Sequence, residues 1–258
     1  ATELGPPGFL PVDATERAAI LARHGLRAVG GFLALVLHDP AVDPEPVVAA
    51  ELEAFVAAGA DTLVLAAATG REGYDVRPEL DEAGWSTLLA TLDRLVALAA
   101  ARGIRATLHP HVGTMVETAA DVERVLAGSS IGLTLDTGHL LIGGADPLSI
   151  ARAYPDRITH VHLKDVDAAW AARVQAGEVS YTDAVRAGMY RPLGQGDARI
   201  GEIVEALESA GYQGWYVLEQ DTILTADPDV ADGRPPRDDV AASVAFLLDL
   251  GVPGRAGE

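Results

Sequence analysis

Short apolar runs alternate with amphipathic stretches along almost the whole chain. Seven of the runs have the length and the aliphatic content of β-strands. They lie at Ala1–Gly5, Arg27–Leu37, Thr62–Thr69, Arg105–His111, Ile131–His139, Ile158–Asp165 and Gly214–Asp221. Several of them, such as Thr62–Thr69, are apolar on both faces, which is typical of parallel strands covered by helices.

The stretches between these runs have helical periodicity. In Trp85–Arg102, apolar residues recur three and four positions apart, and Gly103 provides a stop signal. The segment Ile200–Tyr212 has the same pattern. A last helix is expected to turn four apolar residues inward, namely Val240, Val244, Leu247 and Leu248.

Seven strand–helix units without a break in composition predict one domain over residues 1–258. An open doubly wound sheet would normally carry a glycine-rich phosphate loop after its first strand, and no G-x-G-x-x-G or Walker pattern occurs. We therefore predict an α/β fold, a (β/α)8 barrel. Such a barrel has eight strands, so either its first strand–helix unit is absent from this sequence or the barrel has seven strands. We expect the first, because a missing strand would leave two unpaired edges.

Two segments are longer than the connections elsewhere. After Asp165 we expect a helical excursion over Trp170–Gly188, followed by the loop Met189–Asp197 with its glycine-rich lip. The segment Asp227–Asp239 is rich in Pro, Gly and Asp and is predicted to be a loop over the active face.

The composition narrows the choice of partners. Acidic residues outnumber basic ones 38 to 19, and the net charge of −19 disfavours nucleic acid and anionic membranes. The chain has no cysteine, so a metal ion would need nitrogen and oxygen ligands. The sequence shows neither a membrane span nor a signal peptide, so we expect a cytoplasmic protein, with homo-oligomer formation as an option.

Five of the seven histidines fall near the carboxyl ends of predicted strands. They are His109, His111, His139, His160 and His162. In a parallel barrel these strand ends meet on one face, which is where catalytic residues lie. A single histidine at such a place is more often a core residue, but five of them indicate a site.

Asp136 and Glu219 are carboxylates near the ends of otherwise apolar strands. A buried carboxylate needs a partner, and beside imidazole groups the commonest partner is a metal ion. Two carboxylates with one or two imidazoles suit Mn²⁺, Co²⁺, Fe²⁺ or Zn²⁺, and they suit Ca²⁺ poorly.

Three more residues have two interpretations each. Lys164 lies two positions after His162, and it either faces a substrate oxygen or pairs with Asp165 on the rim. Arg191 likewise either contacts the substrate or forms an ion pair on the surface. Glu72, in a loop after a strand, either touches the substrate or belongs to a solvated loop.

Four motifs together resemble the xylose-isomerase-like barrel superfamily of sugar isomerases, epimerases and dehydratases. They are Asp136-Thr-Gly-His139, His160-Val-His-Leu-Lys-Asp165, Pro192-Leu-Gly-Gln-Gly and Trp215-Tyr-Val-Leu-Glu219. The segment from His109 to Thr118, His-Pro-His-Val-Gly-Thr-Met-Val-Glu-Thr, resembles the inosose dehydratase branch. The resemblance extends through nearly the whole chain.

The resemblance implies one divalent ion, with Asp136, His162 and Glu219 as ligands and His109 as the fourth. Mn²⁺ or Co²⁺ is expected first, with Zn²⁺, Fe²⁺ and Mg²⁺ as alternatives. Most relatives have Glu at the position of His109, and epimerases of this kind use two glutamates to remove and return a proton. An imidazole there favours a one-sided β-elimination. Gln195 also departs from the Glu that relatives often carry.

The reaction that the resemblance implies is the loss of water from a polyhydroxylated cyclic ketone such as scyllo-inosose. Glu219 or Lys164 would take the α-proton, and His139 or His111 would protonate the leaving hydroxyl. The expected substrate contacts are Arg191, Glu72 and His160. Burial and a nearby divalent ion are expected to lower the pKa of Lys164.

Three rival functions stay open. The first is a sugar or inosose isomerase or epimerase on the same metal site. The second is an apurinic-type endonuclease, against which the charge of −19 argues. The third is a non-catalytic sugar-binding barrel, which would have no need for Asp136, His162 and Glu219 to converge. The expected partner in the favoured case is a small uncharged sugar or polyol ketone.

Overall fold

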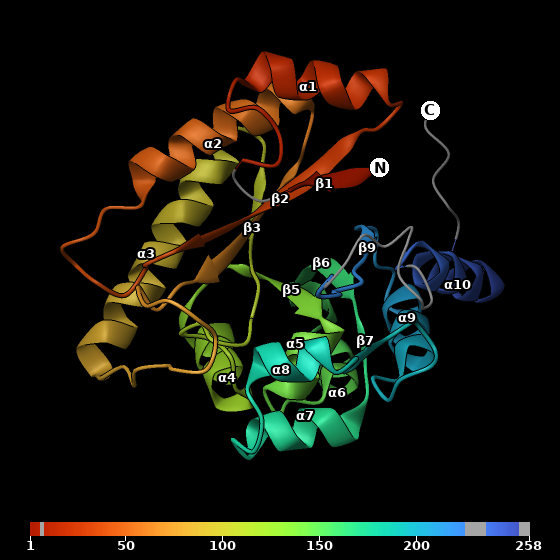
Figure 1. Cartoon of the computed structure of the whole chain (residues 1–258). Helices are drawn as coiled ribbons and strands as arrows, with labels where there is room; N and C mark the ends of the chain where they lie inside the picture. The colour runs from red at the N-terminus through yellow and green to blue at the C-terminus, as the bar shows by residue number, and fades with distance from the viewer. Residues whose placement is uncertain (6–7, 225–235, 253–258) are drawn as a thin grey trace. The chain divides into compact units, whose positions relative to one another are not determined.

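The structure is a computed structural model that describes residues 1–5, 8–224 and 236–252 (Figure 1). Its packing divides the described chain into two compact units. The first unit contains Ala1–Val116 and Ala120–Thr134, and the second contains Glu117–Ala119 and the chain from Leu135 onward. The single domain over 1–258 stays a prediction.

The first unit is built on parallel strands that pair in chain order. They are β1 (Thr2–Leu4), β2 (Ala28–Leu35), β3 (Thr62–Ala67), β4 (Arg105–Leu108) and β5 (Gly132–Asp136), of which the last two residues belong to the second unit. In the register of β3 and β4, Leu65 lies opposite Leu108. All six residues of β3 are buried, as predicted for a strand covered on both faces.

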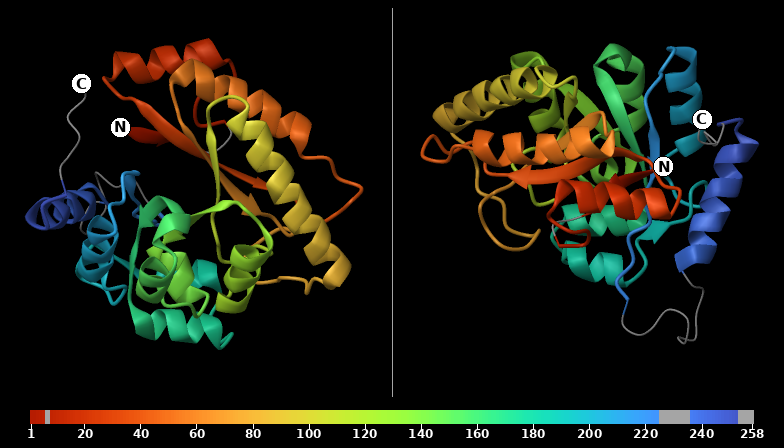
Figure 2. Two further views of the ribbon diagram at one scale, coloured as in Figure 1. Left: turned by 180° about the vertical axis from the view of Figure 1, so that it is seen from behind. Right: turned by 90° about the horizontal axis from the view of Figure 1, so that it is seen from above.

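Helices α1 (Ala14–Arg23), α2 (Glu45–Ala58), α3 (Glu82–Ala100) and α4 (Ala119–Gly128) separate these strands along the chain. Helices α2 and α3 lie side by side (Figure 2). Helix α3 starts where the Asp81 carboxylate accepts a hydrogen bond from the Gly84 backbone N–H, and it buries Leu88, Leu92 and Leu95 completely. The helix predicted over Trp85–Arg102 is therefore confirmed.

In the second unit, β6 (Ile158–Leu163) pairs in parallel with β9 (Tyr216–Leu218), and β7 (Asp165–Val166) pairs antiparallel with β8 (Tyr190–Arg191). Its helices are α5 (Thr137–Ile142), α6 (Pro147–Ala153), the 3₁₀ turn η1 (Pro155–Arg157), α7 (Ala168–Gln175), α8 (Tyr181–Arg186), α9 (Ile200–Ser209) and α10 (Pro236–Asp249). The helical excursion after β6 is present as α7 and α8.

One packing prediction is wrong. In α10 only Leu247 of the four expected residues is buried, whereas Val240, Val244 and Leu248 are exposed. The buried stripe runs through Ser243 and Leu247, four residues apart, and Val244 and Leu248 point away from it around the helix. Val240 points in nearly the same direction as Leu247 but lies two turns nearer the start of the helix, where it is 38% exposed. Of the predicted loop Asp227–Asp239, residues 227–235 lie outside the described residues, and the rest begin α10.

Seven parallel strands, β1 to β6 and β9, alternate with helices along the described part of the chain. This alternation confirms the α/β class and the seven strand–helix units. Among the helices that the structure describes, none is both long and apolar enough to cross a membrane.

Candidate active site

The ammonium group of Lys164 is the centre of a charged cluster in the second unit. Its Nζ atom lies 2.6 Å from Glu219 Oε2, 3.0 Å from Asp221 Oδ2 and 3.6 Å from Asp136 Oδ2. Only 3% of Lys164 is exposed. One buried cation is thus shared by three carboxylates that stand at or just beyond the ends of β5 and β9.

His162 adds an imidazole to the same cluster. Its Nδ1 atom lies 3.1 Å from Glu219 Oε1 and 3.8 Å from Asp136 Oδ2. Two carboxylates and an imidazole form a nitrogen–oxygen donor set of the kind that binds Mn²⁺, Co²⁺, Fe²⁺ or Zn²⁺. The residues of this unit that were predicted to bind a metal therefore suit such an ion in their chemistry, and the imidazole lies near both carboxylates.

His139 lies in a helix, not at the end of a strand. The expected strand over Ile131–His139 stops at Asp136, because the Asp136 carboxylate accepts a hydrogen bond of 2.7 Å from the His139 backbone N–H and caps α5. The helix turns the ring inward, so that His139 Nε2 lies 3.1 Å from Lys164 Nζ. A Cβ atom on Gly138 would come within 2.9 Å of Lys164 Cγ, which explains why a glycine precedes His139.

The fall in the pKa of Lys164 was expected beside a bound divalent ion, and the carboxylates around Lys164 act in the opposite direction. Burial alone would lower the pKa, but the charges of Glu219, Asp136 and Asp221 outweigh it and hold the pKa of Lys164 well above its usual value. The expectation considered only burial and a metal ion, and it left out the carboxylates that surround Lys164. Lys164 is thus a charged group in this structure.

A pair of buried tyrosines completes the surroundings of Lys164. The hydroxyl groups of Tyr181 and Tyr190 are 2.8 Å apart. Lys164 Nζ lies 5.3 Å from the centre of the Tyr190 ring, and the rings of Tyr181 and His139 are 6.0 Å apart. Burial raises the pKa of both phenols. Sequence reasoning missed these residues, since nothing in the local pattern of the excursion distinguishes them from core aromatics.

Asp165 does not pair with Lys164 on the rim, so this interpretation of the two residues is wrong. Its buried carboxylate accepts hydrogen bonds of 2.8–3.0 Å from the backbone N–H groups of Val166, Gly194, Gly196 and Ala198. The glycine-rich lip is therefore folded around this carboxylate. The side chain was missed as a structural centre because its partners lie up to 33 residues further along the chain.

The first unit holds the other two histidines of the predicted site. His109 is buried at the end of β4, and its ring lies 5.3 Å from the ring of His111. The Phe32 ring lies 5.6 Å from His109, edge to face, and 6.0 Å from His111. His111 Nδ1 is 2.7 Å from the carbonyl oxygen of Val112. The roles of His109 as a ligand and His111 as an acid stay predictions.

The three predicted substrate contacts lie in different surroundings. His160 is fully buried, with its ring 5.2 Å from the ring of His162. Arg191 is exposed and forms an ion pair of 3.0 Å with Asp167. Glu72 is exposed in the loop after β3. Contact of these residues with a substrate stays a prediction.

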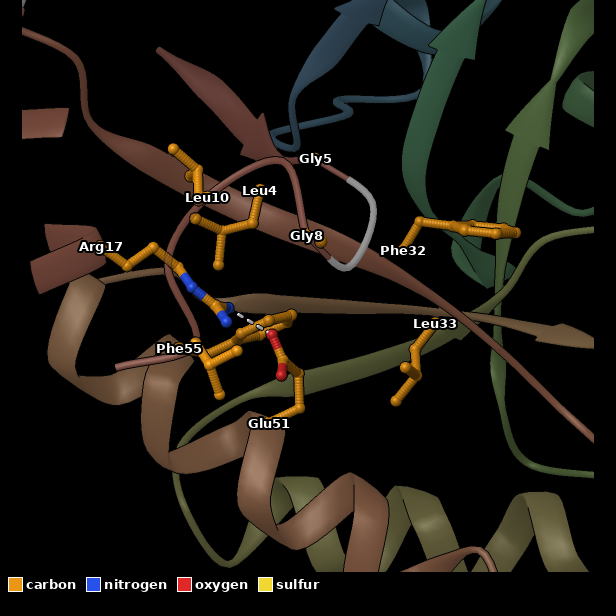
Figure 3. A pocket seen from close by; sticks show the side chains of 11 residues that line it. Leu4, Gly5, Gly8, Leu10, Arg17, Phe32, Leu33, Glu51 and Phe55 are labelled. Atoms are coloured by element: carbon orange, nitrogen blue, oxygen red, sulfur yellow. Dashed lines mark hydrogen bonds and ion pairs between the residues drawn. The ribbon is translucent and has the colours of Figure 1, made fainter. Parts of the chain in front are cut away.

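The first unit also contains a cavity of about 150 Å³ between β1, β2, α1 and α2 (Figure 3). Leu4, Leu10 and Phe55 are among its apolar lining residues. The ion pair between Arg17 and Glu51 crosses one side of it, with 2.5 Å between Nη1 and Oε1. No motif in the sequence indicates this cavity.

Comparisons with known proteins place these observations in a family. Residues 4–250 match the family model of the xylose isomerase-like TIM barrel. An inosose dehydratase of Geobacillus thermodenitrificans is 36% identical over 162 residues, which is 62% of this chain and 53% of that protein. The rhizopine catabolism protein MocC of Rhizobium meliloti is 31% identical over 227 residues, covering 84% of this chain and 69% of MocC.

This chain spans about half the length of the inosose dehydratases it matches. Among solved structures, the IOLI protein with a bound zinc atom resembles it with a TM-score of 0.66 and 16% identity, covering 95% of this chain and 84% of IOLI. At that identity the likeness concerns the fold. With the family model matched over nearly the whole chain, this chain belongs to the xylose isomerase-like TIM barrel family, which confirms the predicted resemblance and barrel fold.

Proposed function

We propose that this protein is a metal-dependent dehydratase, a carbon–oxygen lyase that eliminates water from a polyhydroxylated cyclic ketone such as scyllo-inosose. The observation that carries the proposal is the surroundings of Glu219, whose carboxylate lies 2.6 Å from the buried ammonium of Lys164 and 3.1 Å from Nδ1 of His162. The relatives named inosose dehydratase support the choice of reaction and substrate.

The proposed metal ligands are Asp136, His162 and Glu219, with His109 as the fourth. The first three have the donor chemistry that Mn²⁺ or Co²⁺ accepts, and His162 Nδ1 lies near both carboxylates; Zn²⁺, Fe²⁺ and Mg²⁺ are alternatives. A bound divalent ion would act as a Lewis acid that polarises the ketone and stabilises the negative charge developing on its oxygen.

The residues of this chain would handle the protons. Glu219 takes the α-proton, so that the C–H electrons form the new C=C bond as the C–O bond to the β-hydroxyl breaks. Lys164, held as an ammonium by three carboxylates, faces the oxygen that becomes negative. His139 Nε2 accepts a hydrogen bond from the Lys164 ammonium, so the proton for the leaving hydroxyl would come from the Nδ1–H of His139 or from His111, and the hydroxyl departs as water.

An epimerase or isomerase on the same site is the rival outcome. It would return the proton to carbon and leave the mass of the substrate unchanged. The proposal favours elimination because His109 replaces the second carboxylate base that such a reaction uses. A cytoplasmic location, a small uncharged substrate and assembly into a homo-oligomer are further parts of the proposal.

The test combines metal analysis with product analysis. Purified protein is stripped with a chelator, reloaded with Mn²⁺ or Co²⁺, and incubated with scyllo-inosose. We expect a product that has lost one water molecule, formed only by the reloaded protein. A product of unchanged mass indicates the isomerase or epimerase. Binding of the sugar without turnover indicates a sugar-binding barrel.

A further inference from the structure

A polar pocket of about 330 Å³ lies in the second unit, beside the charged cluster around Lys164. Its walls come from the end of α8 and the start of β8, from the glycine-rich lip, and from the segment that follows β9. Its polar lining includes Arg186, Tyr190, Arg191, Gln195, Gln220 and Asp221. The sequence analysis singled out the lip and Arg191, whereas nothing in the sequence indicated that Gln220 and Asp221 lie beside them.

Two lining residues also touch the surroundings of Lys164. Asp221 Oδ2 lies 3.0 Å from Lys164 Nζ, and the Tyr190 ring centre lies 5.3 Å from the same atom. The side chain of Asp221 is 45% exposed, whereas that of Lys164 is 3% exposed. Asp221 therefore connects the open pocket to the buried ammonium group.

The charges of the lining favour an uncharged ligand. Arg191 pairs with Asp167 at 3.0 Å, and Arg186 pairs with Asp183, so both guanidinium groups of the described lining already have carboxylate partners. Two carboxylates, those of Asp221 and Asp239, also line the pocket, and they disfavour an anionic ligand. The amides of Gln195 and Gln220 each offer donors and an acceptor, which is the complement of a ring that carries several hydroxyl groups.

We infer that this pocket binds the hydroxyl groups of a polyhydroxylated ring that lie remote from the reacting carbons, with Gln195 and Gln220 as specificity-determining residues. The part of this inference that places the reacting carbons beside Lys164 rests on the proposed function. The preference for an uncharged polyol follows from the lining alone. The excursion and the lip would thereby select the substrate, while the ends of β5, β6 and β9 carry the chemistry.

Binding can be measured without turnover. Calorimetry would compare scyllo-inositol, which has the ring hydroxyls and no ketone, on the Mn²⁺-loaded wild type and on the double variant Gln195→Ala/Gln220→Ala. We expect the double variant to raise Kd by about tenfold or more, as the loss of two hydrogen bonds predicts. Gln213→Ala, an exposed glutamine outside the pocket, is the matched control and should bind like the wild type. Equal Kd values in the wild type and the double variant, or no binding to the wild type, would overturn the inference.

Turnover separates this inference from the proposed function. The comparison uses scyllo-inosose and 2,3-dihydroxycyclohexanone, which keeps the reacting groups and lacks the remote hydroxyls. We expect the double variant to lower the ratio of kcat/KM for the two ketones by about tenfold. An equal loss on both ketones contradicts the specificity role. If the wild type converts neither ketone, the proposed dehydratase activity fails, while the calorimetric comparison still decides the pocket.

Discussion

Lys164 Nζ and Glu219 Oε2 lie 2.6 Å apart, and this contact follows from the register of two parallel strands. Leu163 of β6 lies opposite Leu218 of β9, and the Glu219 backbone N–H donates a hydrogen bond of 3.0 Å to the Leu163 carbonyl. The next residue on each strand therefore reaches the same place at the carboxyl end. The pairing of β6 with β9 therefore places the proposed cation, Lys164, beside the proposed base, Glu219.

Replacing Lys164 with Met tests its place in the reaction. The variant removes the ammonium that would stabilise negative charge in the transition state, so we expect kcat to fall by roughly 10²–10⁴-fold. Metal content should stay near that of the wild type, because Lys164 is not a proposed ligand. Steady-state kinetics and elemental analysis on the same preparation measure both quantities. Turnover within about fivefold of the wild type would contradict a catalytic Lys164.

Replacing Asp165 with Asn tests the carboxylate that holds the glycine-rich lip. The amide nitrogen of Asn would face backbone N–H groups that now donate to a carboxylate oxygen, such as those of Gly194 and Gly196. We expect the free energy of unfolding to drop by at least about 2 kcal/mol, measured by urea denaturation. The exposed Asp156→Asn is the control and should change it by less than about 0.5 kcal/mol. Similar values for the two variants would refute the structural role of Asp165.

Gly196 is expected to tolerate no side chain. A Cβ atom there would lie 2.4 Å from Asp165 Oδ1 and 2.7 Å from the Val166 carbonyl oxygen. We expect Gly196→Ala to lower the free energy of unfolding by about 1–3 kcal/mol through overpacking. The control Gly201→Ala lies in α9, where the nearest atom outside its own helix would be 3.7 Å away. Thermal unfolding of both variants measures the difference, and equal stability would argue against the close packing at the lip.

The tyrosine pair predicts a loss of stability at alkaline pH. Burial raises the pKa of Tyr181 and Tyr190, so both phenols stay protonated in the folded state at a pH where those of the unfolded chain ionise. The unfolded state then binds fewer protons, and the free energy of unfolding must fall as pH rises above about 10. Urea denaturation between about pH 8 and 11 measures this slope.

The variant Tyr181→Phe should make the fall in unfolding free energy with pH shallower, since it removes one of the two phenols whose pKa differs between the folded and unfolded states. The exposed Tyr154→Phe provides the control and should leave the slope as in the wild type. A slope that is the same in all three proteins would show that the pair does not couple folding to pH.

The strands and their order along the chain could be predicted because each is a local pattern. The period of two in Ile158–Asp165 placed His162 and Lys164 on one face, and both side chains do lie beside Glu219. The position of His139 could not be predicted from the same pattern, because it depends on Asp136 capping a helix in place of continuing a strand. The Asp-Thr-Gly-His sequence contains that signal, since Asp is a strong helix cap.

The remaining features depend on residues far apart in the chain. The raised pKa of Lys164 depends first on Glu219 and also on Asp136 and Asp221, the last of which lies 57 positions further on. The lip depends on hydrogen bonds such as the one that the Gly194 N–H donates to Asp165. The contacts of Asp221 and Gly194 leave no trace in the spacing of apolar residues. Motifs therefore indicated where the chemistry collects, whereas the charge state of the site and its neighbouring pocket required the three-dimensional structure.

The proposed reaction is the metal-dependent removal of water from a polyhydroxylated cyclic ketone. Mass spectrometry of scyllo-inosose incubated with metal-reloaded wild type and with metal-treated Glu219→Gln tests it most directly. The account predicts that the wild type yields a product lighter by one water molecule, and that Glu219→Gln binds less metal and forms less product, because it loses both a charged ligand and the base. Recovery of unchanged scyllo-inosose from the reloaded wild type, or full activity in Glu219→Gln, would contradict the account.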